Sequence, residues 1–349
     1  MKKILFVLKR RDDYNAVLHS QIGMSTGLYN SANFMNVMLQ DLGIQSKLVV
    51  VTDNNDIDRE VTDYKPTHVV VEALWVVPSK FTVLQKLHPS VTWIIRLHSE
   101  MPFMAGEGMA MDWVGDYSQF KNVIISANAP RMLRETRFYL QHLNHWDNDT
   151  AQQRVIYLPN YYPNEYKYKP FNHDKDTIDI GCFGAVRPLK NHLLQAFGAI
   201  EFAESIDKKL RFHINAGRIE MNGQPVLNNL KGLFQQIADQ GHQLINHQWC
   251  PREEFLKICA EMDIGLQVSF SETFNIVGAD IISQGVPLVG SNEIPWAFSS
   301  FCADPTSSKD IANKLKLAYA MPQVNTWINK TSLQWYTKRT KHIWHRYFK

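Results

Sequence analysis

The sequence predicts an α/β protein made of two doubly wound, Rossmann-like domains. Short apolar runs of strand length recur along the chain, for example at positions 4–8, 67–72 and 264–268, and segments of helical length alternate with them. Strands that alternate with helices form parallel sheets with helices on both faces. At 349 residues the chain is longer than one hydrophobic core usually requires, so two domains are expected.

The composition is that of an ordinary globular protein. Hydrophobic residues make up 45% of the chain and charged residues 20%, with a formal charge of +3. Positions 1–160 hold equal numbers of basic and acidic residues, so the excess lies in the C-terminal half and is too small to prove a nucleic-acid partner. The four cysteines show no paired spacing, which favours a reduced compartment, and we expect a cytoplasmic protein.

No segment has the features of an export signal or a membrane span. The opening stretch MKKILFVLKRRDD meets charge too soon for a signal peptide. No apolar run approaches the roughly 18 residues that suggest a spanning helix. We therefore expect no membrane insertion.

The first half of the chain is predicted to alternate between strands and helices. Strands are expected at 4–8, 46–51, 67–72, 91–97 and 122–126, and helices at about 25–42 and 129–143. Ser25, Thr26 and Gly27 open the first helix, and Gly43 ends it. Because no G-x-G-x-x-G pattern follows the first strand, a dinucleotide cofactor is not expected.

A turn rich in Pro and Tyr at 159–163 marks the boundary between two domains, predicted at 1–163 and 164–325. In the second domain, strands are expected at 179–183, 211–216, 243–247, 264–268 and 286–289, and helices at 192–201, 252–261 and 274–283. An amphipathic helix is expected at 326–349. Its interleaved aromatic and basic residues indicate either packing on the first domain or contact with nucleic acid.

The segment 263–291, DIGLQVSFSETFNIVGADIISQGVPLVGS, carries the main functional signal. A buried strand ends at Val268, a polar turn with Glu272 follows, and an apolar helix then runs to Gln284-Gly285. Ligands of open α/β sheets bind beyond the carboxyl ends of the strands, where a helix N-terminus offers N–H groups to a phosphate. The segment therefore predicts an anion site with a carboxylate beside it.

The pattern S-E-x-F, an acid and then G-V-P-L-V resembles the donor-binding motif of retaining glycosyltransferases of the GT-B fold, the family 4-like group. That family places two acids eight positions apart, which here are Glu272 and Asp280. It usually has Glu at the second place and often has Gly at the position of Asn275. The resemblance implies two Rossmann-like domains facing across a cleft, with a C-terminal helix that crosses back to the first domain.

The resemblance also implies roles for residues of the second domain. Arg187 and Lys190 are expected to bind the donor diphosphate and to stabilise the charge that develops on the leaving nucleotide. Gly184 permits close backbone approach. Glu272 is expected to hold hydroxyls of the transferred sugar, and Asp280 the ribose hydroxyls of a donor that is expected to be a UDP-sugar. Further donor contacts are implied for Gln248, Trp249, Thr273, Phe274, Asn275 and Ile276.

The resemblance places the acceptor on the first domain. His98 and Glu100 follow the strand at 91–97, and in the family a His at this place contacts the donor sugar or the acceptor. The alternative is a loop His packed on Pro102 and Phe103. The expected catalytic residues are His98, Arg187, Lys190 and Glu272.

Ser25, Thr26 and Gly27 match the family's first-loop helix, which faces the donor phosphates or the acceptor. Their alternative role is a simple helix cap with a turn. These three residues complete the expected acceptor side.

Neither a metal nor a cofactor is expected. His242, His247 and Cys250 suggest a zinc site, but four ligands are not evident. GT-B enzymes generally need no divalent ion, because side chains and helix ends stabilise the leaving group. The resemblance implies transfer with retention at the anomeric carbon, by attack on the same face.

The acceptor is expected from a narrower resemblance. The stretch RLHSEMPFM at 96–104 and the compact layout are similar to glycosyltransferases carried by large tailed phages, some of which modify hydroxymethylated pyrimidines in DNA. A hydroxymethylated base in duplex DNA is therefore the expected acceptor, in the host cytoplasm. One alternative is a surface glycan or a lipid-linked sugar. Another, of a different class, is a non-catalytic protein that binds nucleotide sugars.

Overall fold

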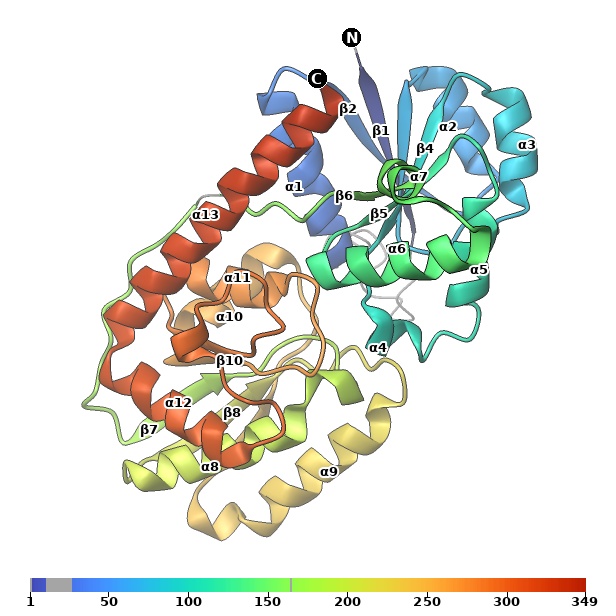
Figure 1. Cartoon of the computed structure of the whole chain (residues 1–349). Coiled ribbons are helices and arrows are strands. Elements are labelled where there is room, and N and C mark those ends of the chain that lie inside the picture. The colour runs from blue at the N-terminus through green and yellow to red at the C-terminus, as the bar shows by residue number, and fades with distance from the viewer. Residues whose placement is uncertain (1, 11–26, 164) are drawn as a thin grey trace. The chain divides into compact units, whose positions relative to one another are not determined.

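The computed structural model describes residues 2–10, 27–163 and 165–349 (Figure 1). The chain divides into two compact units. Unit 1 comprises residues 1–163 and 337–349, and unit 2 comprises residues 164–336. Each unit has its own parallel sheet and its own hydrophobic core.

Unit 1 is built on a parallel sheet in the order β2-β1-β3-β4-β5-β6. The strands are β1 (Lys3–Lys9), β2 (Gln45–Val51), β3 (His68–Glu72), β4 (Thr92–Leu97), β5 (Val123–Ala127) and β6 (Val155–Tyr157). Ile4 of β1 lies opposite both Ser46 and His68, so the strand order reverses at β1. Doubly wound sheets bind ligands beyond the carboxyl ends of the strands at such a reversal.

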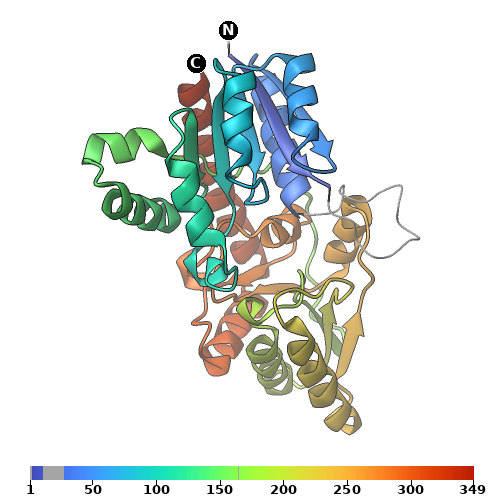
Figure 2. The same ribbon diagram turned by 90° about the vertical axis from the view of Figure 1, so that its right-hand side faces the viewer.

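Helices cover both faces of this sheet (Figure 2). They are α1 (Gly27–Asp41), α2 (Asp56–Tyr64), α3 (Lys80–Leu87), α4 (Met101–Met104), α5 (Ala110–Ser118), α6 (Pro130–Asn144) and α7 (Asn148–Arg154). Successive side chains of a strand point to opposite faces. Leu5 and Val7 therefore join the core beneath α2, α3 and α5, whereas Ile4 and Phe6 join the core beneath α1.

Unit 2 is built on a second parallel sheet, in the order β11-β10-β7-β8-β9. Its strands are β7 (Thr177–Gly181), β8 (Lys209–Ile214), β9 (Gln243–Asn246), β10 (Ile264–Gln267) and β11 (Leu288–Gly290). Its main helices are α8 (His192–Ser205), α9 (Gly223–Gln236), α10 (Arg252–Glu261), α11 (Ile276–Ser283) and α12 (Ser308–Ala320). The order of β10, β7 and β8 brings the loops after these three strands to one edge of the sheet.

The last helix, α13 (Pro322–Phe348), belongs in part to each unit. In unit 2, the side chain of Asn325 bonds both the N–H and the carbonyl of Leu288, at 2.7 and 2.9 Å. In unit 1, Trp344 is fully buried and its indole N–H donates to the carbonyl of Pro159 at 2.8 Å. The helix thus begins four residues before the predicted range of 326–349, and its residues up to Tyr336 lie in unit 2 rather than in a separate tail.

Several helices lack a strong local signal in the sequence. α9 begins at Gly223 and includes Pro225 and two asparagines, which are weak helix formers. It forms because Leu227, Leu230 and Phe234 bury one stripe of the helix against the core of unit 2. Tertiary packing therefore decides this helix.

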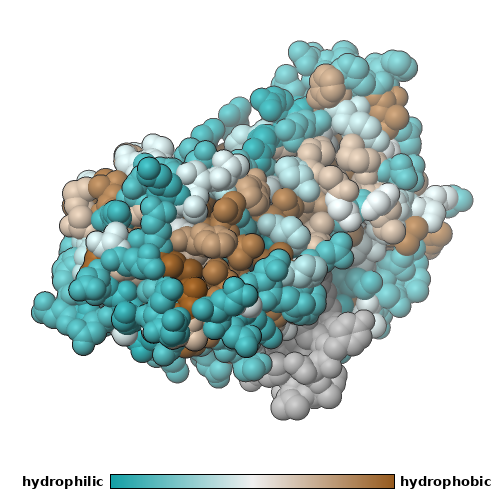
Figure 3. All heavy atoms as spheres, turned by 90° about the horizontal axis from the view of Figure 1, so that it is seen from below, coloured by the Kyte–Doolittle hydropathy of each residue, from teal (hydrophilic) through white to brown (hydrophobic). Residues whose placement is uncertain are grey.

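Figure 3 shows hydrophilic side chains over most of the face that it presents, with apolar ones gathered near its centre. Large exposed apolar residues include Phe138 at 64%, Trp327 at 65% and Trp335 at 68%. Across residues 2–10, 27–163 and 165–349, no helix has both the length and the apolar character that crossing a bilayer requires.

Candidate active site

The predicted donor-side residues lie on loops that follow strands of unit 2. Residues 182–191 follow β7, 215–222 follow β8, 247–251 follow β9 and 268–275 follow β10. In a parallel sheet the carboxyl ends of the strands share one edge. The fold therefore brings together loops that are up to about 90 positions apart in the sequence.

Lys190 and Glu272 form a buried ion pair at this edge. Lys190 Nζ lies 2.5 Å from Glu272 Oε1, and the two side chains are 11% and 8% exposed. Gly184 has a φ of +116°, which favours glycine, and a Cβ there would lie 3.5 Å from Lys190 Cε. Within the loop after β7, Gly184 thus packs closely against the side chain of Lys190. Lys190 and Glu272, two of the predicted catalytic residues, are in contact.

Asn275 explains the departure from the family pattern. Its φ of 60° lies in the left-handed region, where Gly is common and Asn is tolerated. Its Oδ1 accepts from the N–H of Gly278 at 2.7 Å and so caps α11. Its Nδ2 donates to Glu272 Oε1 at 3.2 Å and to Gln267 Oε1 at 3.0 Å. Asn275 therefore supports the carboxylate as well as the helix start.

The side chain of Phe274, one of the residues expected at the donor, points into the core. Its side chain is 2% exposed and packs in the interior of unit 2, with its ring centroid 6.2 Å from that of Trp296. Its carbonyl accepts from the indole N–H of Trp296 at 2.6 Å. The turn that carries Glu272 directs the side chain of Phe274 into the core, so its apolar ring is buried.

Arg187 contacts the loop that follows β8. Its Nη1 lies 3.0 Å from Glu220 Oε2, and Arg218 Nη2 lies 2.6 Å from Glu220 Oε1. Burial, followed by the charges of Lys190 and Arg187, lowers the pKa of the fully buried His192 to about 3.

Asp280 is held by a basic partner that follows β9. Its Oδ1 accepts from Arg252 Nη2 at 2.8 Å and from Arg252 Nε at 3.2 Å. Asp280 is 3% exposed, and α11 carries it. On the loop 247–251, which precedes Arg252, the ring of Trp249 lies 5.7 Å from the guanidinium of Arg218, and Gln248 is exposed. The predicted ribose ligand is thus already engaged by a cation.

The residues that suggested zinc lie in different surroundings. His242 Nδ1 accepts from the N–H of Leu210 at 3.0 Å, and His247 Nε2 lies 2.8 Å from His213 Nδ1. Cys250 is a free thiol whose pKa is raised by burial and by Glu254. Within the described parts of the chain, no three His, Cys, Asp or Glu side chains are placed to hold a metal ion.

In unit 1, His98 belongs to a buried charge network at the carboxyl ends of β3 and β4. Its Nε2 contacts Glu72 Oε2, while Arg96 Nη1 lies 3.0 Å from the same oxygen. Glu72 and Arg96 are fully buried. Burial would raise the pKa of Glu72, but the charges of Arg96 and His98 and their hydrogen bonds hold this pKa below its usual value. Glu72 therefore stays ionised and orients the imidazole.

The other predicted acceptor-side residues divide into three cases. Glu100 is 4% exposed and pairs with Arg131 of α6, so this carboxylate is engaged within unit 1. Gly27 is the first residue of α1. Ser25 and Thr26 lie outside the described residues.

Five charged residues of these networks were not predicted from the sequence: Glu72, Arg96, Arg218, Glu220 and Arg252. Glu72 and Arg96 are 24 positions apart, Arg252 and Asp280 are 28 apart, and Arg187 and Glu220 are 33 apart, so no local spacing reveals these three contacts. Only the pair of Arg218 and Glu220 lies within one loop. Glu72 ends β3, and Arg218 and Glu220 follow β8. Their places after strands are the one signal that indicates a role at a binding edge.

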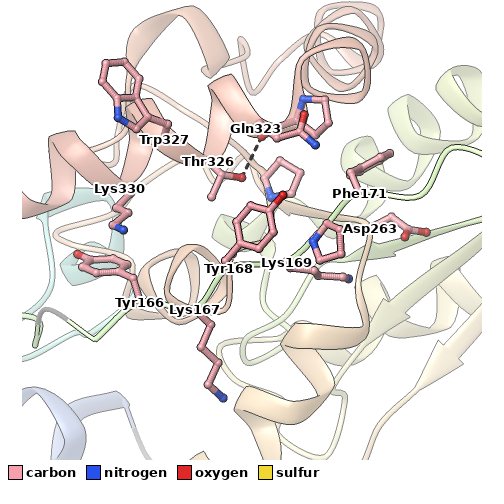
Figure 4. A pocket seen from close by; sticks show the side chains of 14 residues that line it. Tyr166, Lys167, Tyr168, Lys169, Phe171, Asp263, Gln323, Thr326, Trp327 and Lys330 are labelled. Carbon is pink, nitrogen blue, oxygen red and sulfur yellow. Dashed lines mark hydrogen bonds between the residues drawn. The ribbon is translucent and has the colours of Figure 1, made fainter.

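A separate hollow of about 360 Å³ lies at the opposite edge of the unit 2 sheet. Its lining includes Asp263, which directly precedes β10, and Pro287, which directly precedes β11. Figure 4 shows its aromatic wall, with Tyr166 beside Lys330 of α13. Because Glu272 follows the carboxyl end of β10, this hollow is distinct from the predicted donor site.

Neither a protein-family model nor a curated protein sequence matches the chain. Several solved structures, however, are similar to the chain. The chain is similar to trehalose-6-phosphate synthase from E. coli bound with UDP-2-fluoro glucose, with 11% identity, a TM-score of 0.69 and coverage of 99% of this chain and 98% of that one. It is also similar to the UDP-forming α,α-trehalose-phosphate synthase from Burkholderia vietnamiensis, at 11% identity, TM-score 0.65 and coverage of 100% and 96%.

A third similar structure is Anabaena Alr3699/HepE in complex with UDP, at 12% identity, TM-score 0.58 and coverage of 98% and 97%. At such identities the likeness establishes the fold. The chain has the GT-B fold, with two Rossmann-like doubly wound units, and the predicted fold class is confirmed.

Proposed function

We propose that the chain is a retaining glycosyltransferase that moves a sugar from a UDP-sugar to a hydroxyl acceptor without a metal ion. The observation that carries this proposal is the buried Lys190–Glu272 pair at the carboxyl edge of the unit 2 sheet. A cation for the diphosphate and a carboxylate for sugar hydroxyls are thereby placed side by side. The similar structures that contain UDP or a UDP-sugar analogue support uridine in the donor.

The donor residues have separate roles in this proposal. Lys190 and Arg187 bind the diphosphate, where fixed cations stabilise the leaving group most as negative charge develops. Glu272 holds hydroxyls of the transferred sugar, and Asp280 holds the ribose. The backbone at Thr273 to Ile276 approaches the phosphates, together with the start of α11.

The proposed transfer step needs no reactant other than the donor and the acceptor. The bond from the anomeric carbon to the β-phosphate oxygen breaks, and the acceptor oxygen bonds to the same face of that carbon. The acceptor proton passes to the leaving phosphate oxygen. Glu272 accepts from Lys190 and Glu220 accepts from two arginines, so both carboxylates are better suited to binding than to attack on the sugar.

The acceptor side of the proposal is unit 1, where His98 is oriented by Glu72. We propose a hydroxymethylated pyrimidine in phage DNA as the acceptor. The exposed basic residues at the end of α13, Lys338, Arg339 and Arg346, belong to unit 1 and support an anionic polymer as the partner. An enzyme that acts on a base in duplex DNA must reach or flip that base.

The test offers UDP-sugars together with hydroxymethylated DNA, plain DNA or a glycan panel. UDP release and mass spectrometry of the nucleosides report transfer, and NMR of the product reports the anomeric configuration. Sugar on the hydroxymethylated base with retained configuration supports the whole proposal. Transfer only to glycans rejects the DNA acceptor, inversion rejects the retaining step, and no UDP release with any donor leaves a binding protein.

A further inference from the structure

Two arginines converge on one carboxylate beside the proposed donor site. Arg187 Nη1 lies 3.0 Å from Glu220 Oε2, and Arg218 Nη2 lies 2.6 Å from Glu220 Oε1. The side chains of the two arginines are 19% exposed and that of Glu220 is 21% exposed, so solvent still reaches all three. Each guanidinium takes one oxygen of the same anion.

The backbone, rather than this carboxylate, holds the loop in place. The N–H of Val186 donates to the carbonyl of Arg218 at 2.9 Å, and the N–H of Glu220 donates to the carbonyl of Val186 at 3.0 Å. These bonds make a parallel bridge between Val186 and Ile219. Gly223 packs against the same carbonyl, since a Cβ there would lie 2.0 Å from Val186 O. The Glu220 side chain is therefore not required to close the loop.

Arg218 also lies beside the loop that is expected to border the nucleotide base. Its guanidinium is 5.7 Å from the ring of Trp249, a cation–π distance. Gly217 allows this approach, because a Cβ there would lie 2.9 Å from Trp249 N. Arg218 thus contacts both Glu220, which it shares with Arg187, and the ring of Trp249.

We propose that Arg218 is a further donor-binding cation and that Glu220 is an internal anion which the donor's diphosphate replaces. The inference rests on the proposed function of the site. A phosphate offers more acceptor oxygens and more negative charge than a carboxylate, and guanidinium groups bind both anions in forked geometry. Exchange of Glu220 for a diphosphate keeps both arginines paired, so neither is left as an uncompensated charge.

Calorimetric titration with UDP, inorganic pyrophosphate and uridine tests the exchange. Glu220→Gln removes the competing charge and should tighten UDP and pyrophosphate binding about threefold to fivefold. Arg218→Met should weaken both by about tenfold, the loss of one charge-assisted contact. Uridine lacks phosphate and should bind equally to all variants. Glu220→Asp keeps the charge and should not tighten binding.

The matched control is Arg211→Met, because Arg211 also pairs with a carboxylate, Asp179, at 2.5 Å and lies on β8 itself. It should leave all three affinities unchanged. A Glu220→Gln variant that binds UDP no tighter than the wild type overturns the inference, as does an Arg218→Met variant with unchanged affinity. If Glu220 had only a structural role, its replacement would weaken UDP binding, which is the opposite of the predicted change.

The two proposals fail in different ways. If the wild type binds UDP but the variants do not shift its affinity, the exchange is wrong and the donor site stands. If pyrophosphate binds and responds to the variants while UDP shows no further affinity, the anion site stands and the uridine donor is wrong. If neither UDP nor pyrophosphate binds, both proposals fail.

Discussion

Replacing Lys190 by methionine separates the structural role of the Lys190–Glu272 pair from its proposed catalytic role. Methionine keeps an apolar stem and removes the charge. Glu272, 8% exposed, then loses the cation 2.5 Å away and retains the amide of Asn275 at 3.2 Å. Both stability and turnover should fall, for different reasons.

The magnitude follows from the burial of the pair. Breaking a buried ion pair costs about 3–5 kcal/mol, and because Asn275 still donates to Glu272 we expect a loss near the lower end, about 3 kcal/mol. Turnover should fall by about 10²–10³-fold, the usual effect of removing one group that stabilises charge in the transition state.

Urea denaturation measures the loss of stability, and UDP release from UDP-sugar measures the loss of turnover. The matched control is the double variant Lys190→Met with Glu272→Leu, in which the uncompensated carboxylate is also gone. It should regain most of the stability, since an apolar pair can replace a buried ion pair, but not the activity. A Lys190→Met variant that is stable and turns over like the wild type refutes the reasoning.

Three further perturbations test other contacts. Arg252→Leu should weaken UDP binding more than 2′-deoxy-UDP binding in calorimetry, because Arg252 holds Asp280 Oδ1 at 2.8 Å; equal losses would contradict a ribose role for Asp280. Glu72→Gln should lower the free energy of unfolding by about 3–5 kcal/mol in urea, since it leaves the buried Arg96 without its carboxylate; an unchanged midpoint would refute this. Burial raises the pKa of Asp179, but hydrogen bonds from its basic neighbours outweigh burial and hold it at about 2, below its ordinary 3.8. Its stabilising contribution is therefore complete above about pH 4 and lost as the pH falls to about 2, so Asp179→Asn should flatten the acid unfolding curve there, and an unaltered curve would be evidence against it.

Local pattern was sufficient to predict the elements that carry the site. The apolar run at 264–268, the polar turn and the helix ended by Gln284-Gly285 correspond to β10 and α11, and Gly285 has the positive φ, +79°, that a helix end favours. These features depend on neighbours in the sequence, where strand length and helix-stop chemistry can be recognised.

Side-chain partners could not be predicted in the same way. Glu220 lies 33 positions from Arg187, and their contact arises only because parallel pairing of β7 with β8 brings the two loops together. The burial of the Phe274 side chain was not predicted, because a strand–turn–helix pattern does not show which turn residue points into the core. Sequence patterns thus predicted the strand and helix that carry the proposed site, whereas tertiary pairing determines which of its charges contact one another.

These partners change what donor binding requires. Lys190, Arg187 and Asp280 each contact an opposite charge, namely Glu272, Glu220 and Arg252. A donor bound as proposed would exchange or share existing ion pairs rather than meet isolated charges.

We propose that residues of the loops after β7 and β10 and of α11, all in unit 2, form one nucleotide-sugar site. A crystal structure of the protein with UDP tests it most directly. We expect the diphosphate against Arg187 and Lys190 and the ribose against Asp280, at the carboxyl edge of the sheet. UDP bound at another place, such as the aromatic hollow at the opposite edge, would contradict the account.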